Sequence, residues 1–173
     1  MHRKLIVVAI VCSLGALIVP AAFAGGTTHG TVTLTNRTYN DSAGDICPFA
    51  ITITYNATID YTDFYDKDGR AVGENDHVHE QNTYSANGKN LVGNWFTYEQ
   101  IYNVAYDSSG NRYQTSVVGT GQMEVIPLPD GSVFRTAGRL DYLSPEFSDH
   151  SWIIVVNSGL SGNVAAFCAA LAP

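Results

Sequence analysis

Hydrophobic and polar residues alternate along much of this chain, most regularly in the segment that follows Cys47. A large apolar side chain occupies every second position from Phe49 to Tyr55, and Ala or Thr stands at the positions between. A period of two places these side chains on one face of a β-strand. The same parity continues to Tyr61, so the pattern predicts one long strand with a bend near Asn56.

Extended segments recur through the rest of the chain, and short turn sequences separate them. The predicted segments are 31–35, 72–84, 91–98, 101–106, 113–117, 123–126, 134–142 and 152–156. The turns between them are Lys67-Asp68-Gly69, Asn87-Gly88, Ser109-Gly110 and Asp130-Gly131. These turn sequences tolerate the positive φ angles of tight hairpins.

Three further segments interrupt the strand pattern. Residues 36–45 are rich in Asn, Asp, Ser and Gly, which predicts a loop. Residues 59–65 continue the extended pattern, and we interpret the acidic cluster Asp60, Asp63, Asp66 and Asp68 as the tip of the hairpin that follows. Gly119 and Gly121 predict a bulge or a sharp bend within a strand.

The end of the chain has a different period. Val164, Phe167, Cys168 and Leu171 are spaced i, i+3, i+4 and i+7, which predicts one apolar stripe of a short helix. Asn163 stands where an N-cap residue is expected.

Strands joined by hairpins have to hide their edges, either in a closed barrel or in a sandwich. Long bent strands and paired glycines favour the barrel. The predicted fold class is therefore all-β, a single antiparallel β-barrel of about eight strands with a short C-terminal helix.

The first 24 residues are typical of a secretion signal. Basic residues precede the apolar run Leu5–Val19, and Pro20 and the sequence Ala22-Phe23-Ala24 follow it. We expect cleavage rather than an uncleaved anchor, which leaves residues 25–173 as one secreted, extracellular domain. That domain keeps 7 basic and 16 acidic residues, a net charge of −9. Such a charge gives no electrostatic reason to bind nucleic acid or an anionic membrane, and no motif calls for a cofactor.

The segment 25–173 contains two cysteines, Cys47 and Cys168, because Cys12 lies in the signal. Outside the cell a disulfide between them is the default. It would fix the C-terminal helix to the β-structure. A catalytic or metal-binding thiol is the competing interpretation.

Two groups of residues are candidates for binding. His77 and His79 point the same way on a strand, about 7 Å apart at the backbone, and could share a metal; the alternative is a pair of surface histidines. A ring-stacking site for a small apolar or glycan ligand could be built from aromatic side chains; the alternative is ordinary packing on a pleated sheet. The aromatic candidates are Trp95, Tyr98, Tyr102, Tyr106 and Trp152.

Several short motifs resemble those of small secreted β-rich proteins of actinobacteria. They are Cys47-Pro48-Phe49, Asp68-Gly69-Arg70, Asn87-Gly88-Lys89, Pro129-Asp130-Gly131-Ser132-Val133-Phe134, Ala137-Gly138-Arg139 and Phe167-Cys168-Ala169-Ala170-Leu171. This resemblance covers nearly all of residues 25–173 and implies no activity. The stretch Val118-Gly119-Thr120-Gly121 is similar to the glycine-centred strand of dirigent and allene oxide cyclase barrels, which implies a calycin or allene oxide cyclase-like architecture.

The sequence thus leaves three hypotheses. The first is a non-enzymatic extracellular protein that binds a small apolar or glycan ligand. The second is a metal-dependent or cyclase-like barrel enzyme that uses His77 and His79, with Asp149 or His150 as a further ligand. The third is a structural extracellular protein without a ligand.

Overall fold

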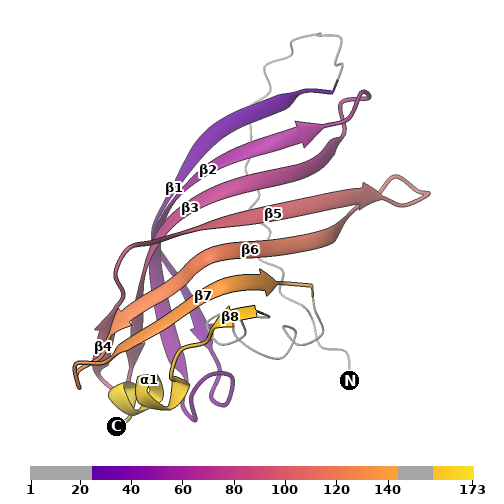
Figure 1. Cartoon of the computed structure of the whole chain (residues 1–173). Helices are drawn as coiled ribbons and strands as arrows, with labels where there is room; N and C mark the ends of the chain where they lie inside the picture. Colours follow the sequence, from indigo (N-terminus) through magenta and orange to yellow (C-terminus); the bar gives the residue numbers. More distant parts are fainter. Residues whose placement is uncertain (1–24, 144–157) are drawn as a thin grey trace.

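The computed structural model describes residues 25–143 and 158–173 and confirms an all-β fold with one C-terminal helix (Figure 1). The strands are β1 (Thr27–Asp41), β2 (Ile51–Tyr65), β3 (Ala71–Ala86), β4 (Lys89–Val92), β5 (Phe96–Tyr106), β6 (Arg112–Pro127), β7 (Val133–Asp141) and β8 (Ser158–Leu160). The helix is α1 (Val164–Leu171). Within the described residues, no helix is long and apolar enough to cross a lipid bilayer.

All eight strands belong to one antiparallel sheet. Its order is β1-β2-β3-β5-β6-β7-β8, and β4 pairs with β3. In the described part of the chain β1 and β8 stand at opposite edges, so the sheet is open and the predicted closed barrel is not established by strand pairing. The strand predicted at 152–156 lies outside the described residues.

The long strand predicted after Cys47 is confirmed, and its pairing is irregular beside Asn56, where the bend was predicted. β2 runs without a break from Ile51 to Tyr65, and its pairing with β1 is irregular between Leu34 and Arg37, opposite Asn56. There the Asn56 side chain accepts a hydrogen bond from the Asn36 N–H (2.9 Å). Two residues of β1 thus stand opposite Asn56, which is the arrangement of a β-bulge.

Two of the predicted loop segments are wrong in part. Residues 36–41 belong to β1, because pairing with β2 satisfies their backbone groups despite a polar composition. The extended run predicted at 59–65 is confirmed as the end of β2, so Asp60 and Asp63 belong to the strand, and only the following residues form the turn. There Asp66 Oδ1 accepts hydrogen bonds from the N–H groups of Asp68 and Arg70, each at 2.9 Å.

The predicted irregularity near the paired glycines is present. β6 continues through Gly119 and Gly121, and its pairing with β7 shifts between Gln122 and Glu124. Gly121 has φ +127°, and a Cβ there would lie 3.0 Å from Tyr98 Cα. Only glycine fits this close approach of two strands.

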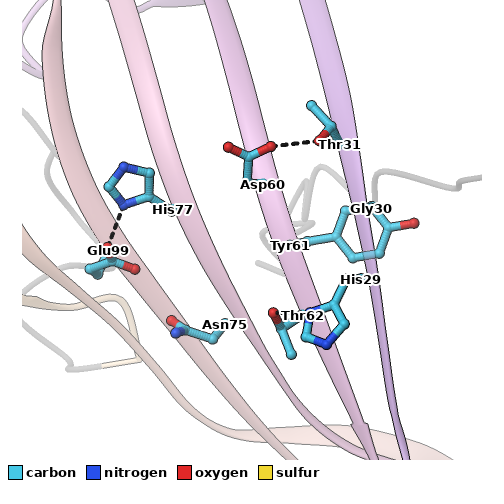
Figure 2. Close-up of a pocket in the computed structure, with 9 residues that line it drawn as sticks. All are labelled: His29, Gly30, Thr31, Asp60, Tyr61, Thr62, Asn75, His77 and Glu99. Carbon is cyan, nitrogen blue, oxygen red and sulfur yellow. Dashed lines mark hydrogen bonds and ion pairs between the residues drawn. The ribbon is translucent and has the colours of Figure 1, made fainter.

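The sheet curls strongly, and its core lies at one end. Ile51 and Ile53 of β2 pack in the same buried cluster as Phe134 of β7. In a flat sheet these strands would be roughly 19 Å apart, four spacings of about 4.8 Å. We call the face that carries this cluster the inner face. The outer face is the opposite one, which carries Asp60 and His77 (Figure 2).

Helix α1 covers the inner face at the core end of the sheet (Figure 1). Its Phe167 is fully buried, with ring centroids 5.2 Å from Tyr84 and 5.1 Å from Phe134. Leu171, the other buried residue of the predicted stripe, belongs to the same cluster. The apolar end of the inner face is thereby closed by the helix.

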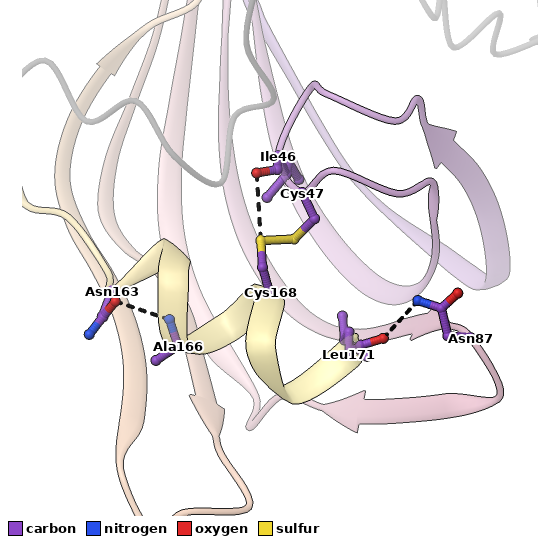
Figure 3. Close-up of a disulfide and its surroundings, with 7 residues drawn as sticks. All are labelled: Ile46, Cys47, Asn87, Asn163, Ala166, Cys168 and Leu171. Atoms are coloured by element: carbon purple, nitrogen blue, oxygen red, sulfur yellow. Dashed lines mark hydrogen bonds between the residues drawn. A yellow bond between two sulfur atoms is a disulfide. The ribbon is translucent and has the colours of Figure 1, made fainter. Parts of the chain in front are cut away.

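The predicted disulfide between Cys47 and Cys168 is present and ties α1 to the segment before β2 (Figure 3). The two Cα atoms are 5.5 Å apart, within the usual range. At the C-terminal end of the helix Asn87 Nδ2 donates a hydrogen bond to Leu171 O (2.9 Å), and Lys89 Nζ donates to Ala172 O. The helix is thus held at its middle and at its C-terminal end.

The N-cap predicted at Asn163 is also present, since Asn163 Oδ1 accepts a hydrogen bond from the Ala166 N–H (3.1 Å). We expect Asn163→Ala to lower the free energy of unfolding by about 1 kcal/mol, because this amide loses its partner. Urea unfolding followed by circular dichroism measures the change. Asn163→Ser keeps a capping oxygen and should cost much less; an equal loss from both variants would contradict the capping role.

Candidate functional site

The inner face changes from apolar to acidic along the length of the strands. On β3, Asp76, Val78, Glu80, Asn82 and Tyr84 are all buried and alternate with more exposed residues. Tyr84 lies in the core beside α1, and Asp76 lies at the opposite end of the row. Buried carboxyl groups are costly unless they are paired or neutral, so this half of the face is the candidate site.

Glu124, on β6, is the carboxyl group nearest to the core. It is completely buried, and its Oε1 accepts hydrogen bonds from Tyr84 Oη and Asn82 Nδ2. Its Oε2 has no hydrogen-bond partner in the described structure. Burial raises the pKa of Glu124 to about 8, although these two hydrogen bonds act in the opposite direction.

Glu80, on β3, is the next buried carboxyl group along the inner face. It is almost fully buried and accepts a hydrogen bond from Tyr98 Oη at 3.1 Å. Burial raises its pKa to about 7, and the hydrogen bonds from Tyr98 and Asn82 oppose that shift. Burial and the nearby Glu80 raise the pKa of the Tyr98 hydroxyl well above its ordinary value, so Tyr98 remains a donor.

Asp76 lies farthest from α1 among the buried carboxyl groups. Asp76 is only 5% exposed, and its Oδ1 atom has no hydrogen-bond partner among the described residues. Glu74 is two positions away on the same face, and it pairs across the strands with Asp63. Burial, Glu74 and then Asp63 raise the pKa of Asp76 to about 8. Three carboxyl groups, Asp63, Glu74 and Asp76, therefore share a small region of the described structure.

Tyrosine rings flank this acidic region. Tyr102 pairs with Glu74 across β3 and β5, and burial followed by the charges of Asp76 and Glu74 raises the pKa of its hydroxyl. Tyr61 pairs with Asp76 across β2 and β3. Its ring lies across Gly30, where a Cβ would be 2.4 Å from the hydroxyl oxygen. Both tyrosines are half-buried, so the region combines a buried acid with accessible aromatic surface.

The structure separates the aromatic residues that the sequence analysis grouped together. Tyr98 and Tyr102 lie on the inner face near Glu80 and Asp76. Trp95 stacks on His79 on the outer face, with ring centroids 4.7 Å apart. Tyr106, near the end of β5, donates a hydrogen bond to Ala71 O (3.0 Å) and lies under the Arg70 guanidinium. Trp152 is outside the described residues.

The two predicted metal ligands share the outer face, as expected. His77 contacts Glu99, with Nδ1 and Oε1 2.5 Å apart, and His79 contacts the Trp95 ring. Within residues 25–143 and 158–173, no group of three His, Cys, Asp or Glu side chains could hold a metal ion. Asp149 and His150 lie outside the described residues, so the metal hypothesis stays a prediction.

The inner-face carboxyl groups were not predicted as a site. Glu74, Asp76 and Glu80 alternate with His77 and His79 along the chain and therefore point to the opposite face of the strand, but the histidine pattern alone does not show which face is buried. Val78 and Tyr84 occupy even-numbered positions, as these three acidic residues do, and both are fully buried. The apolar residues at these alternate positions were therefore the sequence signal that this face is buried. Glu124 could not be found this way, because the shift in pairing after Gln122 changes the parity of β6.

Comparison of the chain with models of protein families, with curated proteins and with solved structures finds no match. The fold and site define an all-β protein with a disulfide-anchored helix at one end of its sheet and an acidic, tyrosine-rich inner face at the other.

Proposed function

We propose that this protein is a secreted β-barrel that binds a small organic cation against the acidic half of its inner face. Barrel closure is supported by the curl of the sheet, which brings β2 and β7 into one core cluster. Secretion is supported by the disulfide and by the signal-like residues 1–24.

The carrying observation is Asp76, a buried carboxyl group with an unpartnered oxygen and with Glu74 and Asp63 nearby. Acidic residues placed opposite each other across strands repel and destabilise a sheet. A bound ammonium group would offset that repulsion and donate a hydrogen bond to Asp76 Oδ1. The acidic cluster is therefore better suited to a cation than to a neutral apolar molecule.

The tyrosines indicate the rest of the ligand. A cation near the faces of Tyr61 and Tyr102 gains a further electrostatic attraction of about 0.5 to 2 kcal/mol. An aromatic or aliphatic body would contact the same rings. We therefore expect a small amine or quaternary ammonium compound with an apolar body.

Isothermal titration calorimetry of the disulfide-bonded protein with tyramine and 4-ethylphenol tests the proposal. The two probes share a phenol ring, and only tyramine carries an ammonium group. We expect tyramine to bind at least tenfold more tightly, a difference of about 1.4 kcal/mol. We also expect its affinity to rise between pH 6 and pH 8, because Asp76, with a pKa of about 8, loses its proton over this range.

Asp76→Asn should abolish the preference for tyramine, and Glu99→Gln is the matched control because it removes one carboxylate from the outer face. Equal affinities for the two probes, or equal effects of the two substitutions, would reject the inner-face cation site. Circular dichroism spectra identical to that of the wild type would show that both variants are folded.

A further inference from the structure

The outer face carries a second concentration of polar side chains, distinct from the inner-face carboxyl groups. Strand register places Thr31, Asp60, His77 and Glu99 in one row across β1, β2, β3 and β5. The adjacent row contains His29, Thr62 and Asn75. Side chains in these rows lie on one face of four neighbouring strands.

A depression of about 520 Å³ lies over these rows (Figure 2). Three contacts order its lining: Thr31 with Asp60 (2.6 Å), His29 with Thr62 (2.9 Å) and His77 with Glu99. The lining therefore offers several fixed hydrogen-bonding groups of both kinds, carboxylate acceptors and hydroxyl or imidazole groups.

Asn75 is the lining residue whose bonding is incomplete. Its Oδ1 is buried and has no hydrogen-bond partner in the described structure. Buried amide oxygens are normally satisfied by protein, water or ligand. This acceptor at the edge of the depression is therefore available to a donor group of a bound molecule.

An aromatic platform adjoins the depression on the same face. The Trp95 indole is 46% exposed and stacks on His79 at an interplanar angle of 29°. His79 is two residues from His77 on β3, about 7 Å along the strand. One side of the indole packs on the imidazole, and the exposed remainder presents an apolar surface beside a polar one.

From these observations we infer that the outer face binds a neutral oligosaccharide of two or three residues. Its hydroxyl groups would donate to Asp60, Glu99 and Asn75 and accept from the threonines and imidazoles, and one pyranose ring would stack on Trp95. A polar lining beside an aromatic ring suits the hydroxyl groups and the apolar ring face of a saccharide. Asp60, His77 and Glu99 point to the face opposite Asp76 and Glu74, so the two proposed sites use different carboxyl groups. Tyr61, which also lines the depression, is the residue they share.

The test is titration of the ¹⁵N-labelled, disulfide-bonded protein with cellotriose, maltotriose and chitotriose, followed by NMR. We expect at least one trisaccharide to bind in the millimolar range and to shift the Trp95 indole resonance. Trp95→Ala should weaken binding about tenfold, which equals about 1.4 kcal/mol of lost stacking. Trp95→Phe, which keeps a ring, should weaken it less, and Asp60→Asn should also weaken it.

Asp76→Asn serves as the matched control, since it removes a carboxylate from the inner face and should leave saccharide affinity unchanged. The inference is overturned if none of the three trisaccharides binds, or if binding survives Trp95→Ala and Asp60→Asn unchanged. It is also overturned if Asp76→Asn abolishes binding as fully as Trp95→Ala does, because the saccharide would then occupy the inner face.

Discussion

The free energy of unfolding is expected to fall as the pH rises from about 5 to 8. Three buried carboxyl groups have raised pKa values: Glu80 at about 7, and Asp76 and Glu124 at about 8. In the unfolded chain they titrate near their ordinary values of about 4, so over this range the folded state retains protons that the unfolded state has released. Each group lowers stability by up to about 1.4 kcal/mol per pH unit in this window. Urea titrations at several pH values measure the slope.

Glu124→Gln should flatten this pH dependence, because a neutral amide can still accept the hydrogen bonds from Tyr84 and Asn82. Asp68→Asn, in the exposed β2–β3 turn, is the control and should leave the slope unchanged. A wild-type stability that rises between pH 5 and 8, or a Glu124→Gln slope equal to that of the wild type, would show that these groups are not held protonated.

Removal of the disulfide is the second substitution with a large expected effect. The bond joins residues 121 positions apart. Its loss gives the unfolded chain more conformational freedom, and it also removes the covalent attachment of α1 to the sheet. We expect the Cys47→Ser, Cys168→Ser double variant to lose about 2 to 5 kcal/mol of unfolding free energy. Guanidinium unfolding with tryptophan fluorescence gives the value.

Dithiothreitol provides an internal control for that experiment. It should destabilise the wild-type protein by a similar amount and leave the double variant unaffected. If the variant and the wild type unfold at the same denaturant concentration, the covalent link contributes nothing beyond the packing of Phe167 and Leu171 against the sheet.

The sequence was sufficient to predict those structural elements that depend on the preferences of a few adjacent residues. The alternation after Phe49, the turn at Asn87-Gly88 and the stripe of α1 each reflect the preferences of a few adjacent residues, and all three are present. The strand character of residues 36–41 was missed because pairing with β2, not their own composition, makes them extended. The curl of the sheet depends on contacts between distant strands, which no local pattern records.

The candidate site was harder to predict than the fold for the same reason. His77 and His79 were placed correctly on a common face, yet the sequence did not show that this face is the outer one. Asp76 and Glu124 lie 48 positions apart, and only the curl of the sheet brings their strands around one interior. A polar strand with a buried face looks like a surface strand until its neighbours are known.

The position of α1 has a practical consequence for attaching this protein to a surface. Pro173 follows the helix at the apolar end, whereas Gly26 O accepts a hydrogen bond from the Tyr65 N–H (2.9 Å) at the opposite end of β2. A linker added after Pro173 would leave Asp63 and its neighbours facing the medium, while one added before Gly25 would crowd them. Sensor chips or affinity resins should therefore carry the chain by its carboxyl terminus.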